Sequence, residues 1–458
     1  MNDDFLYNEN VERFEEMLSK NENWYYDAEE IADIITFYID INDVKNAQKA
    51  LNYALGIHPE NLDLQVKKVE VLIAKRKFTQ AQDLITKLNV VIPSNTDLLI
   101  AQAKIFSIKK KYQKAIDFYE KALEESDEVE YLLSSIGNEF LNMDANEKAL
   151  VYFKKVLEIN LDDEYAFYSI MHCFNQLKNP AHCIKFLLEY IDSRPYSDYA
   201  WYNLGLEYKK QRNFSEAIRA FDYAILINEK FLSAYWQKAN ALEKTTRYDE
   251  AVKVYEESLQ YDDTPSFTHL KIGKCYKSMA LPLKALASFY NAIYDDPQMD
   301  KAWAEAAYVY AEMKNLDEAI YYLKKALELN PEHVQYIKKY ITFTIENQGI
   351  DEALSYYDQL IQLEPENENN VLGKAELLLF TKAYRQVIDF LENYCKNHTQ
   401  PEALYYLSFS YLSTHQTNLG FDLFKQAYTL APELVKIYKK HFKKIFENPL
   451  IKSFLNKK

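Results

Sequence analysis

Apolar residues recur along this chain in pairs of short stretches, each with the i, i+3, i+4, i+7 spacing of one helix face. Between residues 198 and 231, the apolar positions are Trp201, Leu204, Gly205 and Tyr208, followed by Ala217, Phe221 and Ala224. A short polar segment, residues 212–215, separates the two stretches. The pattern predicts two helices joined as a hairpin.

The hairpin pattern returns with a period of 34 residues. Twelve units are predicted, starting at residues 28, 62, 96, 130, 164, 198, 232, 266, 300, 334, 368 and 401, and only the last step is 33 residues. Position 20 of the unit is alanine in nine of them: Ala47, Ala81, Ala115, Ala149, Ala217, Ala251, Ala285, Ala319 and Ala353. Position 32 is proline in seven: Pro59, Pro93, Pro195, Pro297, Pro331, Pro365 and Pro432. We therefore expect a repeat protein.

The residue types at positions 8, 11, 20, 24 and 32 of the unit each have a physical reason. Small residues at positions 8 and 20 allow the two helices to approach closely, and a bulky residue at position 11 or 24 fills the space toward the next unit. Proline at position 32 ends the second helix, because it has no N–H to continue the hydrogen-bond ladder. A single hairpin cannot bury its own apolar face, so the units must stack.

Glycine is scarce, with 7 in 458 residues, and no two glycines lie closer than 24 residues. Glycine-rich phosphate loops and the G-x-S-x-G nucleophile motif need glycines a few residues apart, so both are excluded. Tight β-turns also use glycine. The composition thus favours an all-α fold and argues against several large classes of enzyme.

The 34-residue spacing and its Trp, Leu, Gly, Tyr, Ala, Phe, Ala and Pro positions resemble the tetratricopeptide repeat family over residues 28–432. The resemblance implies an α-solenoid that winds as a right-handed superhelix. Residues 1–27 are expected to form an N-terminal capping helix with Val11, Phe14 and Leu18 on one face, followed by a Trp24–Tyr26 plug. Residues 433–458 are expected to form a basic C-terminal capping helix and tail.

The two ends differ in charge, because residues 1–60 carry a net −10 and residues 433–458 a net +6. Beside an apolar stripe, the C-terminal helix places five lysines: Lys436, Lys439, Lys440, Lys443 and Lys444. Such a helix either caps the solenoid or lies on an anionic membrane surface, and the cap is favoured. The charge asymmetry would also permit head-to-tail association, although a monomer is the simpler expectation.

By the same resemblance, the first helix of each unit lines a concave groove with positions 2, 5, 6 and 9. The predicted partner-binding residues are Tyr165, Tyr168, His172, Tyr199, Tyr202, Asn203, Trp236, Gln237, Asn240, Lys271 and Lys274. Trp236 is the main candidate anchor, because its neighbour Tyr235 already fills a core position. The three amides could pair with an extended peptide backbone, and the two lysines with an acidic group. The alternative is that these side chains only pack between adjacent units.

Other chemistry has little support in the sequence. Some relatives hold a chaperone's C-terminal carboxylate in a Lys/Asn clamp, but no three successive units here complete it; one has Lys338 in place but Thr342 where the clamp needs Asn. The pairs His172-Cys173 and His182-Cys183 suggest zinc ligands, but both cysteines are expected to pack inward. We predict no metal site, no cofactor and no catalytic residues.

The formal net charge of −15 disfavours a nucleic-acid partner. The N-terminal sequence lacks the pattern of a signal peptide, and no apolar run is long enough to span a membrane, which predicts a cytoplasmic protein. Abundant Tyr, Lys, Asn and Ile suggest a bacterial source. The predicted function is a non-enzymatic scaffold or adaptor that binds a peptide segment or a helix of a protein partner. The alternative is a regulatory sensor whose superhelix changes shape on binding.

Overall fold

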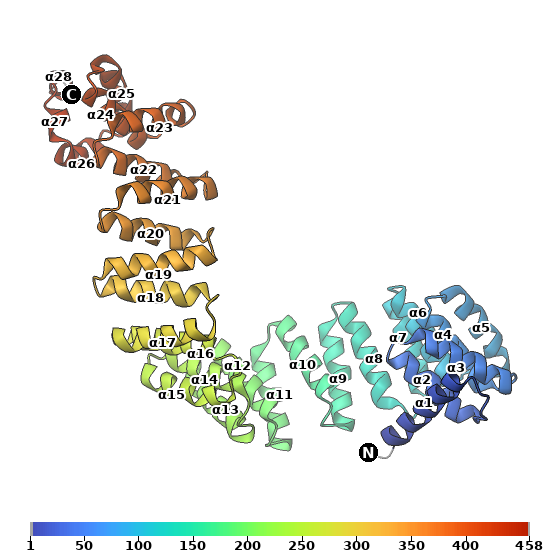
Figure 1. Cartoon of the computed structure of the whole chain (residues 1–458). Helices are drawn as coiled ribbons and strands as arrows, with labels where there is room; N and C mark the ends of the chain where they lie inside the picture. Colours follow the sequence, from blue (N-terminus) through green and yellow to red (C-terminus); the bar gives the residue numbers. More distant parts are fainter. Residues whose placement is uncertain (1–2, 457–458) are drawn as a thin grey trace. The chain divides into compact units, whose positions relative to one another are not determined.

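The computed structural model describes residues 3–456, with side chains from residue 9 onward, and this part of the chain is entirely helical apart from its connections. It divides into two compact units, Met1–Asp192 and Ser193–Lys458, which are described separately. The prediction of an all-α repeat fold is confirmed. Within each unit, successive helices lie side by side as a stack of hairpins (Figure 1).

The first unit begins with α1 (Asp3–Lys20), and five hairpins follow. Their helices are α2 (Ala28–Asp40), α3 (Val44–Ile57), α4 (Leu62–Ala74), α5 (Phe78–Val91), α6 (Thr96–Ile108), α7 (Tyr112–Leu123), α8 (Val129–Asn142), α9 (Asn146–Ile159), α10 (Glu164–Leu177) and α11 (Pro180–Ser193).

The second unit holds the remaining hairpins and three short C-terminal helices. The hairpin helices are α12 (Asp198–Lys210), α13 (Phe214–Ile227), α14 (Leu232–Lys244), α15 (Tyr248–Ser258), α16 (Ser266–Ser278), α17 (Pro282–Asp295), α18 (Asp300–Glu312), α19 (Leu316–Leu329), α20 (Val334–Glu346), α21 (Ile350–Leu363), α22 (Glu368–Phe380), α23 (Tyr384–Asn397), α24 (Pro401–Ser413) and α25 (Thr417–Leu430). The last three are α26 (Leu434–His441), α27 (Lys443–Phe446) and α28 (Pro449–Leu455).

The period of the sequence reappears in the backbone. A non-glycine residue with positive φ follows each first helix, at Asn42, Arg76, Lys110, Asp144, Lys178, Arg212, Thr246, Ala280, Lys314, Gln348, Lys382 and His415. In the hairpin of α12 and α13, the residue after Arg212 closes the turn: the Asn213 N–H donates to the Tyr208 carbonyl oxygen, 2.9 Å away. This is the six-to-one bond of a Schellman C-cap, and it reverses the chain without glycine.

The close approach of the two helices is confirmed at positions 8 and 20. All nine alanines at position 20 have no exposed surface. A Cβ atom added to Gly137, Gly205 or Gly273 at position 8 would lie 2.8, 2.5 or 2.4 Å from the phenylalanine ring at position 24 of the same hairpin. The ring thus occupies the space that a side chain at position 8 would need.

The N-terminal cap differs from the prediction in one residue. Val11, Phe14 and Met17 are buried, whereas Leu18 is 38% exposed. The reason is that the chain turns back over the Met17 side of α1, where the Trp24 N–H donates to the Met17 Sδ at 3.3 Å. Of the predicted aromatic plug, Tyr26 is fully buried and Tyr25 is exposed.

The basic C-terminal segment is three short helices rather than one helix and a tail. The first break falls at Phe442 (φ −115°, ψ 43°), and Pro449 starts the last helix. The breaks fold the segment onto the last hairpin, so that Tyr438, Phe446 and Ile451 are buried against α24 and α25. Most of the apolar stripe of this segment therefore packs inside the protein, although Ile437 is 54% exposed.

Candidate functional site

The first helices of successive hairpins contact each other directly, as between α12 and α14 and between α16 and α18. Their shared surface, which we call the first-helix face, holds most of the predicted groove residues. Those on α12, α14 and α16 belong to the second unit. Tyr165, Tyr168 and His172 lie on α10 in the first unit and are a separate set.

The amide of Gln237 links two first helices. The Lys209 Nζ on α12 donates to the Gln237 Oε1 on α14 at 2.6 Å. The Tyr202 ring packs beside it, with its centroid 4.8 Å from that of Phe231 and 5.9 Å from that of Phe221. Burial raises the pKa of the Tyr202 hydroxyl, which keeps it neutral near pH 7. These contacts make Tyr202 part of the packing between hairpins as well as of the surface.

Trp236 is half-buried and has an internal partner. Its indole Nε1–H donates to the Thr268 Oγ1 on α16 at 3.0 Å, and its ring centroid lies 5.1 Å from that of Phe267. Thr268 is fully buried and in turn donates to the Asp262 Oδ2 at 2.6 Å. The predicted anchor therefore already joins α14 to α16, and its polar group is committed to that contact.

We expect Trp236→Phe to lower the local stability of α14–α16 by about 1 kcal/mol, because a phenylalanine ring fills the space but removes the hydrogen bond to Thr268. Amide hydrogen exchange of these helices measures the effect. Asn240→Ala on the same helix is the control and should leave exchange unchanged. Exchange of the Trp236→Phe chain at the wild-type rate would show that the hydrogen bond is not structural.

The side-chain amides of Asn203 and Asn240 differ in their hydrogen bonds within the protein. The Asn203 Nδ2 donates to the Tyr199 carbonyl oxygen of its own helix at 2.7 Å. Asn240 is half-buried, and among the described residues its side chain makes no hydrogen bond within the protein. Asn240 is therefore the predicted amide most ready to bind a partner's backbone.

The two predicted lysines, Lys271 and Lys274, differ in their partners. Lys274 and Lys277 both pair with Glu305 on α18, at 3.1 and 2.9 Å. Burial alone would raise the pKa of Glu305, but these two ammonium groups lower it, so the carboxylate is firmly ionised. Lys271 instead lies over the Phe267 ring, 5.6 Å from its centroid. Its charge is not neutralised by a carboxylate in the described structure.

In the first unit, the predicted tyrosines are exposed. Tyr165 is 55% exposed, and its hydroxyl donates to the Asn138 Oδ1 on α8 at 2.5 Å. Tyr168 is 51% exposed and packs edge-on against Phe167, with ring centroids 5.7 Å apart. His172 is also exposed. These side chains are accessible to a binding partner, and Tyr165 also links the first helices α10 and α8.

Cys173 and Cys183 are buried, as predicted, with 0% and 2% of their surface exposed. Burial raises the pKa of the Cys173 thiol to about 11, which keeps it protonated near neutral pH. Thiolate is the form that binds zinc, so Cys173 is poorly suited to a metal. Within residues 3–456, histidine, cysteine and carboxylate side chains nowhere gather in threes.

Sequence reasoning missed two lysines on the first-helix face. Lys209 and Lys244 lie at positions 12 and 13, one helical turn beyond the last position used in the prediction. Both lysines lie three or four residues after position 9, which is one helical turn. Extending the predicted face by one turn would therefore have included both. They place additional positive charge beside Gln237 and Asn240.

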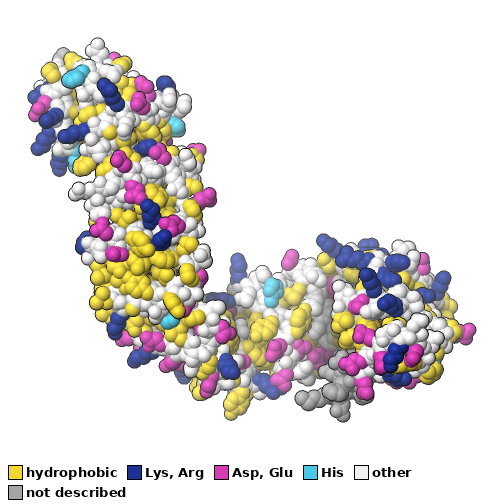
Figure 2. Space-filling model, viewed as in Figure 1, with side chains coloured by type: hydrophobic (Ala, Val, Ile, Leu, Met, Phe, Trp, Pro, Cys, Tyr) yellow, Lys and Arg dark blue, Asp and Glu magenta, His cyan; other side chains and the backbone are white. Residues whose placement is uncertain are grey.

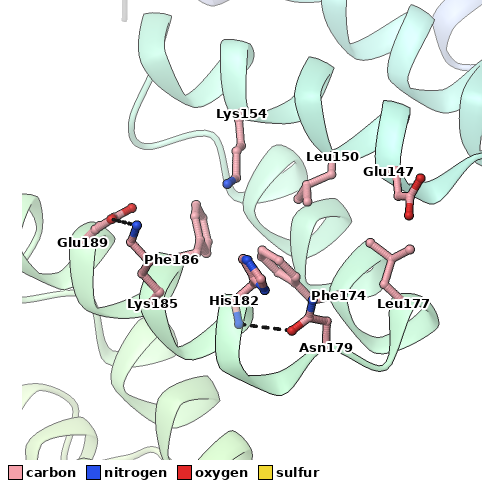
Figure 3. Close-up of a pocket in the computed structure, with 10 residues that line it drawn as sticks. All are labelled: Glu147, Leu150, Lys154, Phe174, Leu177, Asn179, His182, Lys185, Phe186 and Glu189. Carbon is pink, nitrogen blue, oxygen red and sulfur yellow. Dashed lines mark hydrogen bonds and ion pairs between the residues drawn. The ribbon is translucent and has the colours of Figure 1, made fainter.

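A pocket of about 310 Å³ in the first unit is lined by residues of α9, α10 and α11 (Figure 3). Phe174 and Phe186 lie beside it, and the Lys154 Nζ is 5.7 and 5.4 Å from their ring centroids. Lys185 pairs with Glu189 at its edge at 3.7 Å. The lining mixes both charge signs, so it favours neither anions nor cations, and the first-helix face remains the stronger candidate.

The stacked hairpins and the first-helix face define the class of the protein: a helical-repeat scaffold. Family models described as tetratricopeptide repeat match residues 96–128, 199–231, 232–265 and 300–333, each within one residue of a predicted unit start. These stretches of the chain are therefore tetratricopeptide repeats, as the sequence pattern predicted.

Curated relatives match only part of this chain. The chain is similar to human protein O-mannosyl-transferase TMTC3, with 29% identity over 24% of this chain and 12% of the relative. It is also similar to human DnaJ homolog subfamily C member 7, with 30% identity over 27% of this chain and 23% of that relative. The match thus spans less than a quarter of either relative's length.

The chain is also similar to solved structures, at low sequence identity and low TM-score. One is YrrB, described as a TPR protein with an unusual peptide-binding site (18% identity, TM-score 0.34, 41% of this chain and 97% of that chain). Another is the Cut9–Hcn1 hetero-tetramer of APC/C (13% identity, TM-score 0.34, 88% of this chain and 90% of that chain). Across the described residues, no helix has the length and apolar character needed to cross a membrane.

Proposed function

We propose that the protein is a scaffold that binds an extended segment of a protein partner along the first-helix face of its second unit, across α12, α14 and α16. The observation that carries the proposal is Asn240: it lies on α14, the middle helix of this face, and its amide makes no hydrogen bond to the described residues, while Tyr202 and Phe267 lie on the flanking helices α12 and α16. An asparagine can bond both the N–H and the C=O of an extended backbone.

Neighbouring side chains support the same use of the surface. Phe267 is 40% exposed and offers an apolar contact beside Trp236. Asn203 bonds the Tyr199 carbonyl oxygen, and Gln237 bonds both Lys209 and Tyr202, which holds these two side chains in place. A surface whose side chains are held before binding loses less conformational freedom when a partner binds.

A photo-crosslinking amino acid at position 240 tests the proposal. In a lysate of the source organism, the chain carrying it should form a discrete crosslinked product, and mass spectrometry should locate one partner segment. The matched control carries the same amino acid at Lys253, which is exposed on the second helix α15 of the same hairpin. The same products from both positions, or none from position 240, would contradict binding at this face.

A further inference from the structure

Three lysines of the second unit's first-helix face have no carboxylate partner among the described residues: Lys209, Lys244 and Lys271, which we call the lysine triad. They come from three successive first helices, α12, α14 and α16. Lys209 donates to the neutral amide of Gln237, and Lys271 lies over the Phe267 ring. Lys274 and Lys277, further along the same face, instead have carboxylate partners, because both pair with Glu305 and Lys277 also pairs with Glu312.

The triad acts as one group electrostatically. Burial lowers the pKa of Lys209, and the positive charges of Lys244 and Lys271 lower it further. Glu243 is the one acid that opposes this effect, and its carboxylate also accepts a hydrogen bond from the Tyr255 hydroxyl at 2.5 Å. A positive potential thus persists on this face of a chain whose net charge is −15. Like charges held together without counter-charges destabilise the free protein, and an anion would relieve the repulsion.

We propose that the lysine triad receives the carboxylates of an acidic segment in the bound partner. This inference rests on the proposed function and adds the chemical class of the segment. Three ammonium groups on successive helices suit an extended chain with several acidic side chains, because each helix can contact a different residue. A nucleic acid fits less well, since a long polyanion would also meet the surrounding negative charge of the protein.

The test uses a fluorescein-labelled hexaglutamate peptide, with fluorescence anisotropy and the full-length chain. Lys209→Gln, Lys244→Gln and Lys271→Gln should each weaken binding about fivefold, the effect of one ion pair in a solvent-exposed setting. Raising the salt concentration should weaken binding of the wild type more than that of the triple variant. Lys253→Gln, on the second helix of the same hairpin as Lys244, removes the same charge and should leave affinity unchanged.

The C-terminal lysines provide a second control, because they form another basic surface. Lys439→Gln, Lys440→Gln and Lys443→Gln combined should leave most of the peptide binding intact. If that variant loses binding while the triad variant keeps it, the site is the C-terminal segment and the proposal is wrong. Tighter binding of a dodecathymidine oligonucleotide than of hexaglutamate would also overturn it.

The pH dependence supplies an independent readout. Only the protonated form of Lys209 forms an ion pair, and its pKa is lowered in the free protein, where Lys244, Lys271 and Glu243 face it. Affinity should therefore begin to fall at a lower alkaline pH than it would for a site built from ordinary lysines, and binding should take up protons in that range. Equal affinity from pH 7 to 10 would contradict a role for Lys209.

Failure of this inference can be told apart from failure of the proposed function. If crosslinking at position 240 identifies one partner segment, but the segment lacks acidic residues and triad variants bind it normally, the peptide site stands and the acidic specificity is wrong. If position 240 crosslinks nothing while hexaglutamate binding still depends on the triad, the anion site stands without the extended peptide site.

Discussion

Replacing Gly273 with valine should destabilise the hairpin of α16 and α17 by about 1–3 kcal/mol, the usual cost of adding atoms to a filled core. The first added carbon would lie 2.4 Å from a ring carbon of Phe289, whose side chain is fully buried and has little room to move. Circular dichroism at increasing temperature should show the loss, and hydrogen exchange should place it in α16 and α17.

A second substitution tests the reason for the effect. In the next hairpin, positions 8 and 24 are Ala307 and Leu323, both fully buried. Gly273→Ala combined with Phe289→Leu reproduces that pair. The two changes should therefore be coupled favourably by about 0.5–3 kcal/mol, with the double variant more stable than the sum of the single effects predicts.

Gly56→Ala is the matched control for Gly273. Gly56 also lies in a helix, α3, but nothing lies within 4 Å of an added Cβ. Its replacement should be neutral or stabilise by up to about 1 kcal/mol, through helix propensity alone. If Gly273→Ala behaves like Gly56→Ala, the contact with Phe289 does not limit the size of residue 273.

The repeat architecture was predictable because it depends on properties that recur. Nine alanines at one position and prolines at another fix the period, and the helices then begin at or within one residue of the predicted starts. The pairing of a glycine at position 8 with a phenylalanine at position 24 was not predicted, because the pattern assigned the bulky residue at position 24 to the space toward the next unit, whereas its ring lies against the glycine of its own hairpin.

The ends were less predictable because they have no period. Both Met17 and Leu18 fit a helix face that includes Phe14, and only the turn at Asn21–Trp24 decides which is buried. In the C-terminal segment, helical spacing alone favours one long helix. The breaks at Phe442 and before Pro449 let the segment fold back, so that Tyr438, Phe446 and Ile451 are buried against α24 and α25.

The candidate site was predictable in place but not in detail. Helical spacing identified the first-helix face, yet it could not show that Trp236 donates to Thr268 or that Lys209 meets Gln237. These contacts join different repeats, so they depend on how far each hairpin rotates against the next. That rotation is determined by packing between hairpins and has no simple signature in the period.

Phe446→Ala should destabilise the last hairpin by about 3–5 kcal/mol, because it removes a buried ring from the core between α24, α25 and the C-terminal helices. Phe446 is 4% exposed, and its ring centroid lies 5.9 Å from those of Phe409 and Phe424. Faster hydrogen exchange in α24 and α25 would show the loss. The effect follows from the segment acting as a cap that covers the end of the repeat stack.

The lysines of the same segment provide the comparison that separates a cap from a membrane helix. Lys436, Lys439, Lys440, Lys443 and Lys444 are exposed, and basic side chains gather over this end of the chain in Figure 2. Replacing Lys439, Lys440 and Lys443 with glutamine should leave stability within about 0.5 kcal/mol of wild type, as is usual for surface positions.

The membrane alternative makes the opposite prediction for Phe446. An amphipathic helix binds a bilayer through its apolar side chains, so Phe446→Ala would then spare stability and abolish co-sedimentation with phosphatidylserine vesicles. We expect instead that any co-sedimentation depends on the lysines and disappears in moderate salt, since Tyr438, Phe446 and Ile451 are buried in the protein. The two variants thus test whether Phe446 stabilises the fold and whether the lysines alone mediate contact with a membrane.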